Sequence, residues 1–383
     1  MNTIIPAMLI SAGGSTTELG VLTAIMIGGS SFMQIVFAGF LFKKERKKGY
    51  LLTGIYLRVG ALLGLGFLLS KASGLSAFYV IGAIFILISI FSFSGSFANI
   101  SYTDILGKSI LGDNRKRFFV FRQVILSAGI LMSALIVRHL VRRYPYPVNY
   151  SVLFVSAGVL LLIASLGFWM IREKPTDFED SGIHLMSVLS ALKKMFIEDV
   201  NLRYYILLRN STGIGLTLVP FYISLAKKHL GLTAQAVGNF LLLQIIGMIV
   251  SNLLWHFIIR KGSYKGLVKI YTLIGSLLPI FALLFSRSKA IYPFIFLLSG
   301  FNISAYQIAL PGILLEISQE HNRALYTALS GAGGIFAIVF PMIAGALISY
   351  LGYPFVFGVS ILITATSVLF LRKIDCKRSV KAG

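Results

Sequence analysis

Long uninterrupted apolar stretches dominate the sequence and constrain its fold more than any other feature. Eleven of them are long enough to cross a lipid bilayer, at about 18–42, 50–70, 76–100, 118–140, 149–171, 204–226, 233–259, 266–286, 291–316, 325–350 and 354–371. A spanning helix needs about 20 apolar residues, whereas a membrane barrel strand has about 10 and alternates in polarity. Backbone polar groups in lipid must be satisfied within the segment. The sequence therefore predicts an all-α polytopic membrane protein.

The composition excludes most soluble proteins. The chain is 57% apolar and 13% charged, against about 45–50% and about 25% in an ordinary soluble domain. Its single cysteine, Cys376, allows neither an intramolecular disulfide nor a thiolate metal cluster. The sequence has no paired nucleophile and base and no ATP-binding loop. We therefore expect no enzymatic activity, no cofactor and no bound metal.

The longest polar stretch, at 172–201, separates the apolar stretches into two sets. Such polar runs between apolar segments mark linkers. We expect an N-terminal six-helix bundle over 1–171, a cytoplasmic linker over 172–202, a C-terminal six-helix bundle over 203–372 and a basic cytoplasmic tail over 373–383.

A weak internal repeat relates the two sets. Three short segments recur in the same order at separations of 208 to 218 residues: 3–6 as 217–220, 18–20 as 236–238 and 113–115 as 321–323. Such a repeat favours two similar bundles. Residues 203–216 complete a span before Thr217, but only two residues precede Thr3. We therefore expect the first helix to be truncated by about 14 residues, the alternative being a genuine half-helix.

The basic residues indicate an orientation. Assigning alternate loops to one side, beginning after residue 42, places 25 of the 35 Lys and Arg residues on one face and eight on the other. By the positive-inside rule the first face is cytoplasmic, as are the linker and the C-terminus. The basic run at 43–48 lies between two spans, so we expect it to anchor to anionic lipid and not to nucleic acid. The predicted protein is a monomer in the inner or plasma membrane.

Short basic motifs follow the second and eighth predicted helices and precede the fifth and eleventh. They are Gly39-Phe40-Leu41-Phe42-Lys43-Lys44-Glu45-Arg46-Lys47-Lys48, Arg260-Lys261-Gly262-Ser263-Tyr264-Lys265, Asn114-Arg115-Lys116-Arg117-Phe118 and Asn322-Arg323-Ala324-Leu325-Tyr326. With six plus six helices and a cytoplasmic linker, the chain resembles the major facilitator superfamily of secondary transporters. The resemblance implies two bundles rocking about a midplane site, with gating residues at Lys44, Arg115, Arg260, Gly262 and Arg323.

Two features depart from that family's pattern. The loop after the second helix has Lys43 where the family has Asp and Arg46 where it has Gly. The Gly-Pro signature of drug antiporters is absent from 118–140, which contains no proline. These departures disfavour the family's charge relay in this loop and classical drug–proton antiport.

Two arginines lie inside predicted spans. Arg58 is eight residues past Tyr50, about 12 Å into the bilayer, and Arg209 is six residues past Arg203, about 9 Å deep. Intramembrane charges are costly and mark functional sites, and guanidinium groups bind carboxylate or phosphate bidentately. We hypothesise that one or both contact an anionic substrate. The alternative is snorkelling to the interface or pairing with Asp104 or Glu316.

Asp104 and Glu316 lie near the cytoplasmic ends of the fourth and tenth predicted helices. As a gate latch they need only proximity to basic residues such as Arg115 and Arg323. As proton-coupling groups they need burial that raises the carboxyl pKa. We favour the latch because neither carboxylate is central.

Neutral amides at mid-span are further substrate candidates. The family resemblance places helices 1, 4, 7 and 10 around the cavity, which brings forward Asn99, Asn210, Asn302 and Gln307 beside the two arginines. Each amide can equally serve as an interhelical hydrogen-bonding group, worth about 0.6 kcal/mol.

Taken together, the sequence predicts a secondary active or facilitative transporter that moves a small solute by alternating access. The intramembrane arginines and amides favour an anionic or polar organic substrate. A transporter-like lipid flippase or a non-transporting membrane sensor is the alternative from another class.

Overall fold

The computed structural model describes residues 3–42, 45–109, 112–171, 173, 197–231, 233–261, 263–318, 326, 330 and 333–375. Within these, the side chains of 30–42, 103–104, 106–109, 112–124, 127, 234 and 259–261 are not described. Internal contacts divide the chain into two compact units. Unit 1 comprises Met1–Ile4, Thr16–Thr23 and Ile183–Gly383, and unit 2 comprises Ile5–Ser15 and Ala24–Gly182.

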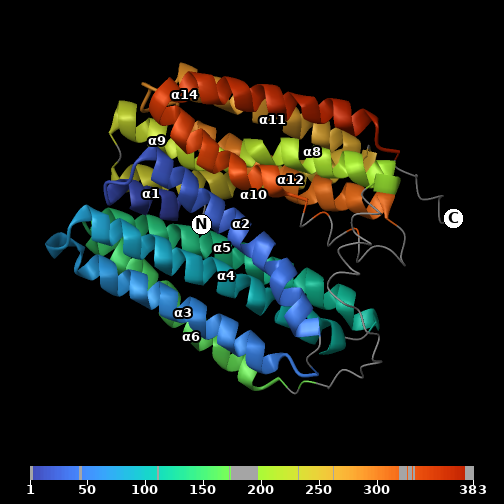
Figure 1. The fold of residues 1–383 in the computed structure, drawn as a ribbon, viewed down its shortest axis with the longest axis horizontal. Helices are drawn as coiled ribbons and strands as arrows, with labels where there is room; N and C mark the ends of the chain where they lie inside the picture. The colour runs from blue at the N-terminus through green and yellow to red at the C-terminus, as the bar shows by residue number, and fades with distance from the viewer. Residues whose placement is uncertain are drawn as a thin grey trace. The chain divides into compact units, whose positions relative to one another are not determined.

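Unit 2 is built from helices that follow the predicted spans. They are α1 (Ile4–Ser11), α2 (Thr16–Phe42), α3 (Lys48–Ser70), α4 (Ala77–Ser109), α5 (Gly112–Arg143) and α6 (Val148–Trp169), with a short 3₁₀ turn η1 (Ala72–Gly74). The starts of α1 and α2 belong to unit 1. α3 lies between α4 and α6 and packs along both (Figure 1).

Unit 1 contains α8 (Val200–Thr217), α9 (Val219–Leu230), α10 (Ala234–Lys261), α11 (Tyr264–Leu284), α12 (Phe294–Ile317) and α14 (Ile335–Arg372). The predicted span at 204–226 is broken at Leu218, since Pro220 has no N–H to donate to the carbonyl of Leu216. The two spans predicted at 325–350 and 354–371 correspond to two helical segments of α14 that meet at Gly352. The backbone of Gly352 is not helical, and its φ of 79° suits a residue without Cβ.

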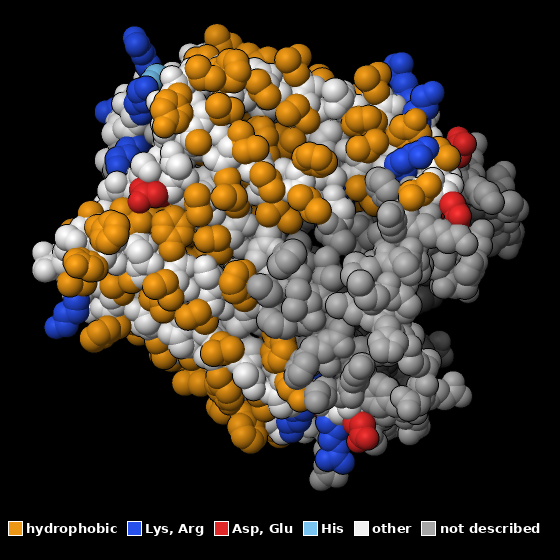
Figure 2. Space-filling view, viewed as in Figure 1, with side chains coloured by type: hydrophobic (Ala, Val, Ile, Leu, Met, Phe, Trp, Pro, Cys, Tyr) orange, Lys and Arg blue, Asp and Glu red, His pale blue; other side chains and the backbone are white. Residues whose placement is uncertain are grey.

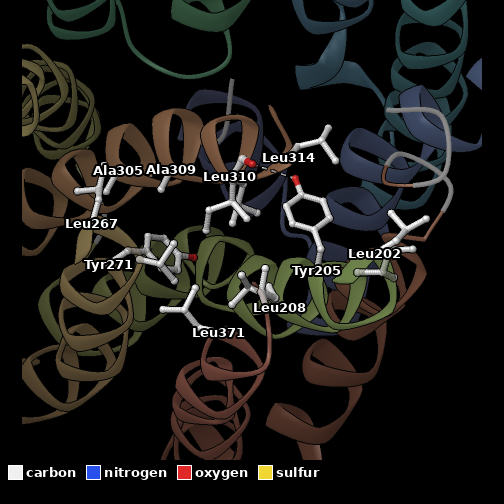
Figure 3. Packing of buried hydrophobic residues seen from close by; sticks show 14 of the residues in the cluster. Leu202, Tyr205, Leu208, Leu267, Tyr271, Ala305, Ala309, Leu310, Leu314 and Leu371 are labelled. Carbon is white, nitrogen blue, oxygen red and sulfur yellow. Dashed lines mark hydrogen bonds between the residues drawn. The ribbon is translucent and has the colours of Figure 1, made fainter. Parts of the chain in front are cut away.

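Each unit has an apolar interior and an apolar outer surface. In unit 1, side chains of α8, α11, α12 and α14 form a buried cluster that includes Leu208, Tyr271 and Leu310 (Figure 3). Large hydrophobic side chains are also exposed, for example Tyr350 at 86% and Phe78 at 82%. They cover the face seen in Figure 2, where Lys and Arg side chains gather toward helix ends. Water would penalise this surface, but lipid does not.

Among the described residues, eight helices are long and apolar enough to cross a membrane. The prediction of an all-α polytopic fold is therefore confirmed, and the chain is a multi-pass membrane protein.

Candidate functional site

Arg58 lies on the buried stripe of α3 that faces α4. Its guanidinium carbon lies 4.2 Å from the centre of the Phe91 ring. Gly95 of α4 lies beside it: a methyl group added there would make an ordinary contact of 3.5 Å with the same carbon. The Nε atom is buried and has no hydrogen-bond partner in the described part of the chain. Burial lifts the energy of an unpaired charge, and the ring face offsets only about 0.5–2 kcal/mol of it.

Asn99 lies on the same side of α4 as the Arg58 guanidinium. Phe91, Gly95 and Asn99 are spaced four residues apart, which aligns them along one helix face. Asn99 is exposed and Arg58 is half-buried. The structure therefore brings two of the predicted substrate contacts, one charged and one amide, to one face of unit 2.

Arg209 in unit 1 has a protein partner. Its Nη1 donates a 2.9 Å hydrogen bond to Ser330 Oγ. This contact joins α8 to the segment before α14. The geometry favours a bracing role for this arginine.

Asn210 is fully engaged by the backbone. Its Nδ2 donates to the carbonyls of Ile206 at 2.9 Å and Gly333 at 2.6 Å. Its Oδ1 accepts from the N–H groups of Phe336 at 3.0 Å and Ala337 at 3.4 Å. Both donors and both lone pairs are used, so Asn210 caps the first turn of α14, whose N–H groups lack intrahelical partners.

Asn302 and Gln307 lie apart on α12. Asn302 is buried against Gly275 of α11, whereas Gln307 is exposed. Five residues correspond to about 140° around a helix, so the two amides point to different sides.

Most of the predicted gating residues fall outside the description. The structure does not describe Lys44, Gly262 or Arg323, nor the side chains of Asp104, Arg115 and Arg260. Glu316 is described, and its Oε2 is buried without a hydrogen-bond partner among the described residues. Its role in a latch stays a prediction.

Other charged residues, counted in the sequence only for topology, form a clasp in unit 2. The Glu173 carboxylate accepts hydrogen bonds from the backbone N–H groups of Lys47 at 2.6 Å and Lys48 at 2.7 Å. Lys48 Nζ donates to the carbonyls of Trp169 at 2.6 Å and Ile171 at 2.9 Å. An acid thus meets the N-terminus of α3, and an ammonium group meets the C-terminus of α6, as the helix dipoles favour.

Unit 1 repeats half of this clasp. Lys265 Nζ at the start of α11 donates to the carbonyl of Ile374, just after α14 ends. Ser263 Oγ, in place of a carboxylate, accepts from the N–H of Gly266 at 3.3 Å and caps α11. The one signal in the sequence was the internal repeat: Lys265 follows Lys48 by 217 residues, within the repeat's range of separations.

Comparisons with known proteins agree with this architecture. The family model of the Major Facilitator Superfamily matches residues 205–381. A variant of the nucleoside transporter NupG is similar in structure with a TM-score of 0.73 at 12% identity, over 98% of this chain and 95% of that chain.

Two sugar transporter structures are similar over the same extent. A D-xylose–proton symporter has a TM-score of 0.71 at 14% identity, covering 97% of this chain and 93% of that one. The inward-open xylose transporter XylE from E. coli has 0.68 at 13% identity, covering 99% and 93%. No curated protein sequence is a significant match. The Major Facilitator Superfamily model thus matches the C-terminal helices, and the fold of these transporter structures is shared along the whole chain.

Proposed function

We propose that this chain is a secondary transporter that moves a small anionic or polar organic solute by alternating access. The proposal keeps the predicted division into two six-helix halves joined by a linker at 172–202. It is supported by the shared fold with nucleoside and xylose transporters and by the polar groups that unit 2 carries within a spanning pair of helices.

The observation that carries the substrate class is Arg58. It lies within a membrane-spanning helix, and its buried Nε has no hydrogen-bond partner in the described part of the chain. Maintaining such a charge is unfavourable unless a ligand uses it. A carboxylate or phosphate would accept two parallel hydrogen bonds from the guanidinium edge while the ring of Phe91 supports its face.

Asn99 would allow this site to bind neutral polar groups of the solute as well. An amide offers both donors and an acceptor, so a hydroxyl or carbonyl on the same solute would find a partner one helical turn beyond Gly95. Arg209, Asn210, Asn302 and Gln307 complete the proposed substrate set from the sequence. The bonds already made by Arg209 and Asn210 and the 1% exposure of Asn302 rank these three behind Arg58.

Uptake into proteoliposomes tests the proposal. The wild-type protein is assayed with a panel of carboxylates, phosphate esters, nucleosides and sugars, with and without a pH gradient. We expect saturable uptake of an anionic solute, its loss in Arg58→Gln, and partial retention in Arg58→Lys. Arg138→Gln, which changes an exposed arginine of α5, is the matched control. Phospholipid movement without uptake of any solute would overturn the proposal in favour of a flippase.

The orientation is testable with the chain's single cysteine. We propose that the C-terminal tail is cytoplasmic, so Cys376 in whole cells should resist a membrane-impermeant maleimide and react after permeabilisation. A Cys376→Ser protein carrying Lys289→Cys, in a loop predicted to lie outside, should react in intact cells. The reverse pattern would invert the proposed topology.

A further inference from the structure

Basic side chains gather at the end of unit 1 that is predicted to face away from the cytoplasm. That predicted face of the membrane holds eight Lys and Arg residues, and half of them belong to this end. They are Lys227 and Lys228 in the last turn of α9, and Arg287 and Lys289 in the connection between α11 and α12. Figure 2 shows Lys, Arg and His side chains at the end of unit 1 where Figure 1 labels α9 and α14.

Two hydrogen bonds hold the connection between α11 and α12 against α9. The Nδ1 atom of His229, in the last turn of α9, lies 3.0 Å from Ser286 Oγ. The Tyr292 hydroxyl donates to the carbonyl of Tyr222 on α9 at 2.6 Å. Ser286 and Tyr292 are both buried. The two basic residues of the connection lie between these anchors, so it presents them beside the end of α9.

The end of α9 also contacts α14. Lys228 Nζ lies 5.8 Å from the centre of the Tyr353 ring. The Tyr353 hydroxyl is hydrogen-bonded to Ser224 Oγ, with 2.8 Å between the two oxygens. We define the α9 basic cluster as four exposed residues of this end: Lys228, His229, Arg287 and Lys289. Lys228 and Arg287 are each one residue away from a partner in the bond between His229 and Ser286, so their long side chains can reach one phosphate group.

The sequence supplies few carboxylates that could neutralise the α9 basic cluster. It contains no Asp or Glu from 200 to 315. Glu18, at the start of α2, is the one acidic residue of unit 1 that the predicted topology puts at this end, against four Lys and Arg residues. This end of unit 1 therefore has a net positive charge, which attracts anions.

The cluster lies where two spanning helices reach the membrane boundary. α11 ends at Leu284 and α12 begins at Phe294, and both are long and apolar enough to cross the membrane. Leu284, Ile291 and Phe294 are all exposed. These three side chains flank the basic residues of the connection, so cations and lipid-facing apolar groups meet at one boundary.

This combination favours an anionic lipid over a dissolved anion. Lysine and arginine bind phosphate through charge-assisted hydrogen bonds, and basic groups near the membrane surface recognise anionic headgroups. A free phosphate or carboxylate would use the cations alone. A phospholipid uses both kinds of group, because its acyl chains lie along the apolar side chains while its phosphate reaches the cations.

We propose that the α9 basic cluster binds the phosphate group of an anionic phospholipid. The predicted topology puts this site on the other membrane face from the basic run at 43–48, so it is a second lipid contact and not part of that anchor. The inference does not depend on the proposed function, since a lipid on the outside of unit 1 requires no transported solute.

Fluorescence quenching by brominated lipids tests the site in the full-length protein. Phe294→Trp places a reporter beside the connection, and Trp169→Phe removes an exposed native tryptophan. The remaining Trp255 is buried, so its emission should not depend on the lipid. In phosphatidylcholine vesicles at low salt, brominated phosphatidylglycerol should associate about fivefold more tightly than brominated phosphatidylcholine. Equal quenching by the two brominated lipids would overturn the proposal.

Removing charge from the cluster separates specific binding from a general effect of net charge. In the reporter protein, Arg287→Gln with Lys289→Gln should lower the preference for phosphatidylglycerol to less than about twofold, whereas Arg287→Lys should retain most of it. Arg138→Gln with Arg142→Gln removes the same charge from the exposed end of α5 in unit 2 and should leave the preference unchanged. An equal loss in the unit 2 variant would contradict the proposal.

Two further measurements cover a dissolved anion and a reporter protein that does not fold. Millimolar glycerol 3-phosphate at constant ionic strength should not displace the brominated phosphatidylglycerol, and displacement would indicate a site for a free anion instead. Native mass spectrometry of the wild-type protein needs no reporter. It should show phosphatidylglycerol retained over phosphatidylcholine, and equal retention of the two lipids would count against the site.

Discussion

In both units a polar side chain packs against a glycine where two neighbouring helices cross, but the two crossings differ in charge and exposure. In unit 2, Arg58 of α3 lies across Gly95 of α4. In unit 1, Asn302 of α12 lies across Gly275 of α11. Gly275 follows Arg58 by 217 residues, the same separation as Lys265 from Lys48. The polar side chain therefore comes from the first helix of the pair, α3, in unit 2 and from the second helix of the pair, α12, in unit 1.

The difference in burial indicates how the two groups are used. Arg58 is half-buried, so a ligand can reach its guanidinium. Asn302 is 1% exposed, inside the core of unit 1. A charge can be kept in a membrane helix when a partner arrives to neutralise it, whereas a sealed amide must be satisfied within the protein. We therefore propose that unit 2 contributes solute recognition and unit 1 rigidity.

The largest expected effect is the difference in solute uptake between variants of Arg58 and of Asn302. Arg58→Gln should lower the transport of an anionic solute by about 10- to 100-fold, since a hydrogen bond to a charged group is worth about 1.5–3 kcal/mol. Asn302→Leu should lower stability but change the uptake rate of the folded protein by less than about threefold. Initial uptake rates per folded molecule in proteoliposomes measure both. Equal losses of uptake in the two variants would break the comparison.

A second effect concerns Asn210, the cap of α14. Asn210→Ala leaves the N–H groups of Phe336 and Ala337 without their acceptor. We expect a loss of about 2 kcal/mol in stability, seen as a lower midpoint in thermal unfolding in detergent. Asn210→Asp keeps the acceptor and should recover part of the loss. If both variants match the wild type in stability and fail only in uptake, Asn210 contacts the solute instead.

The lysine clasps should show a smaller difference between units. Lys48→Met removes the bonds to the carbonyls of Trp169 and Ile171, whereas Lys265→Met removes the bond to Ile374. We expect losses of about 1–2 and about 1 kcal/mol, the first reduced by solvent at its exposed bond. Glu173→Gln should weaken unit 2 further, and unit 1 has no equivalent carboxylate at Ser263. Chemical unfolding at low and high salt measures these losses, and equal salt dependence in both units would contradict the asymmetry.

The smallest effect separates the two glycines. A Cβ on Gly95 would meet Arg58 at 3.5 Å, an ordinary contact, so Gly95→Ala should change stability by less than about 0.5 kcal/mol. A Cβ on Gly275 would meet Asn302 Nδ2 at 3.3 Å, a tighter contact, so Gly275→Ala should cost up to about 1 kcal/mol. Thermal midpoints of the two variants, measured side by side, test the order.

Much of the fold could be predicted because it depends on local properties of the chain. A run of about 20 apolar residues must be helical in lipid wherever it packs, so the spans followed from the sequence. The break at Gly352 lies between two predicted spans. The break at Leu218 was harder to predict, since a proline inside a span is compatible with a continuous helix as well as a bent one.

The partners of the candidate residues depended on the tertiary structure. Lys48 meets Ile171 across 123 residues, Arg209 meets Ser330 across 121, and Asn210 meets Phe336 across 126. Nothing local distinguishes an arginine that is braced from one that is free, nor an amide that caps a helix from one that binds a solute. The sequence by itself determined which polar groups enter the membrane, because each one's position within an apolar run can be read directly from the chain. Only the packing of the helices decided which of them, Arg58 above all, has a buried atom without a hydrogen-bond partner among the described residues.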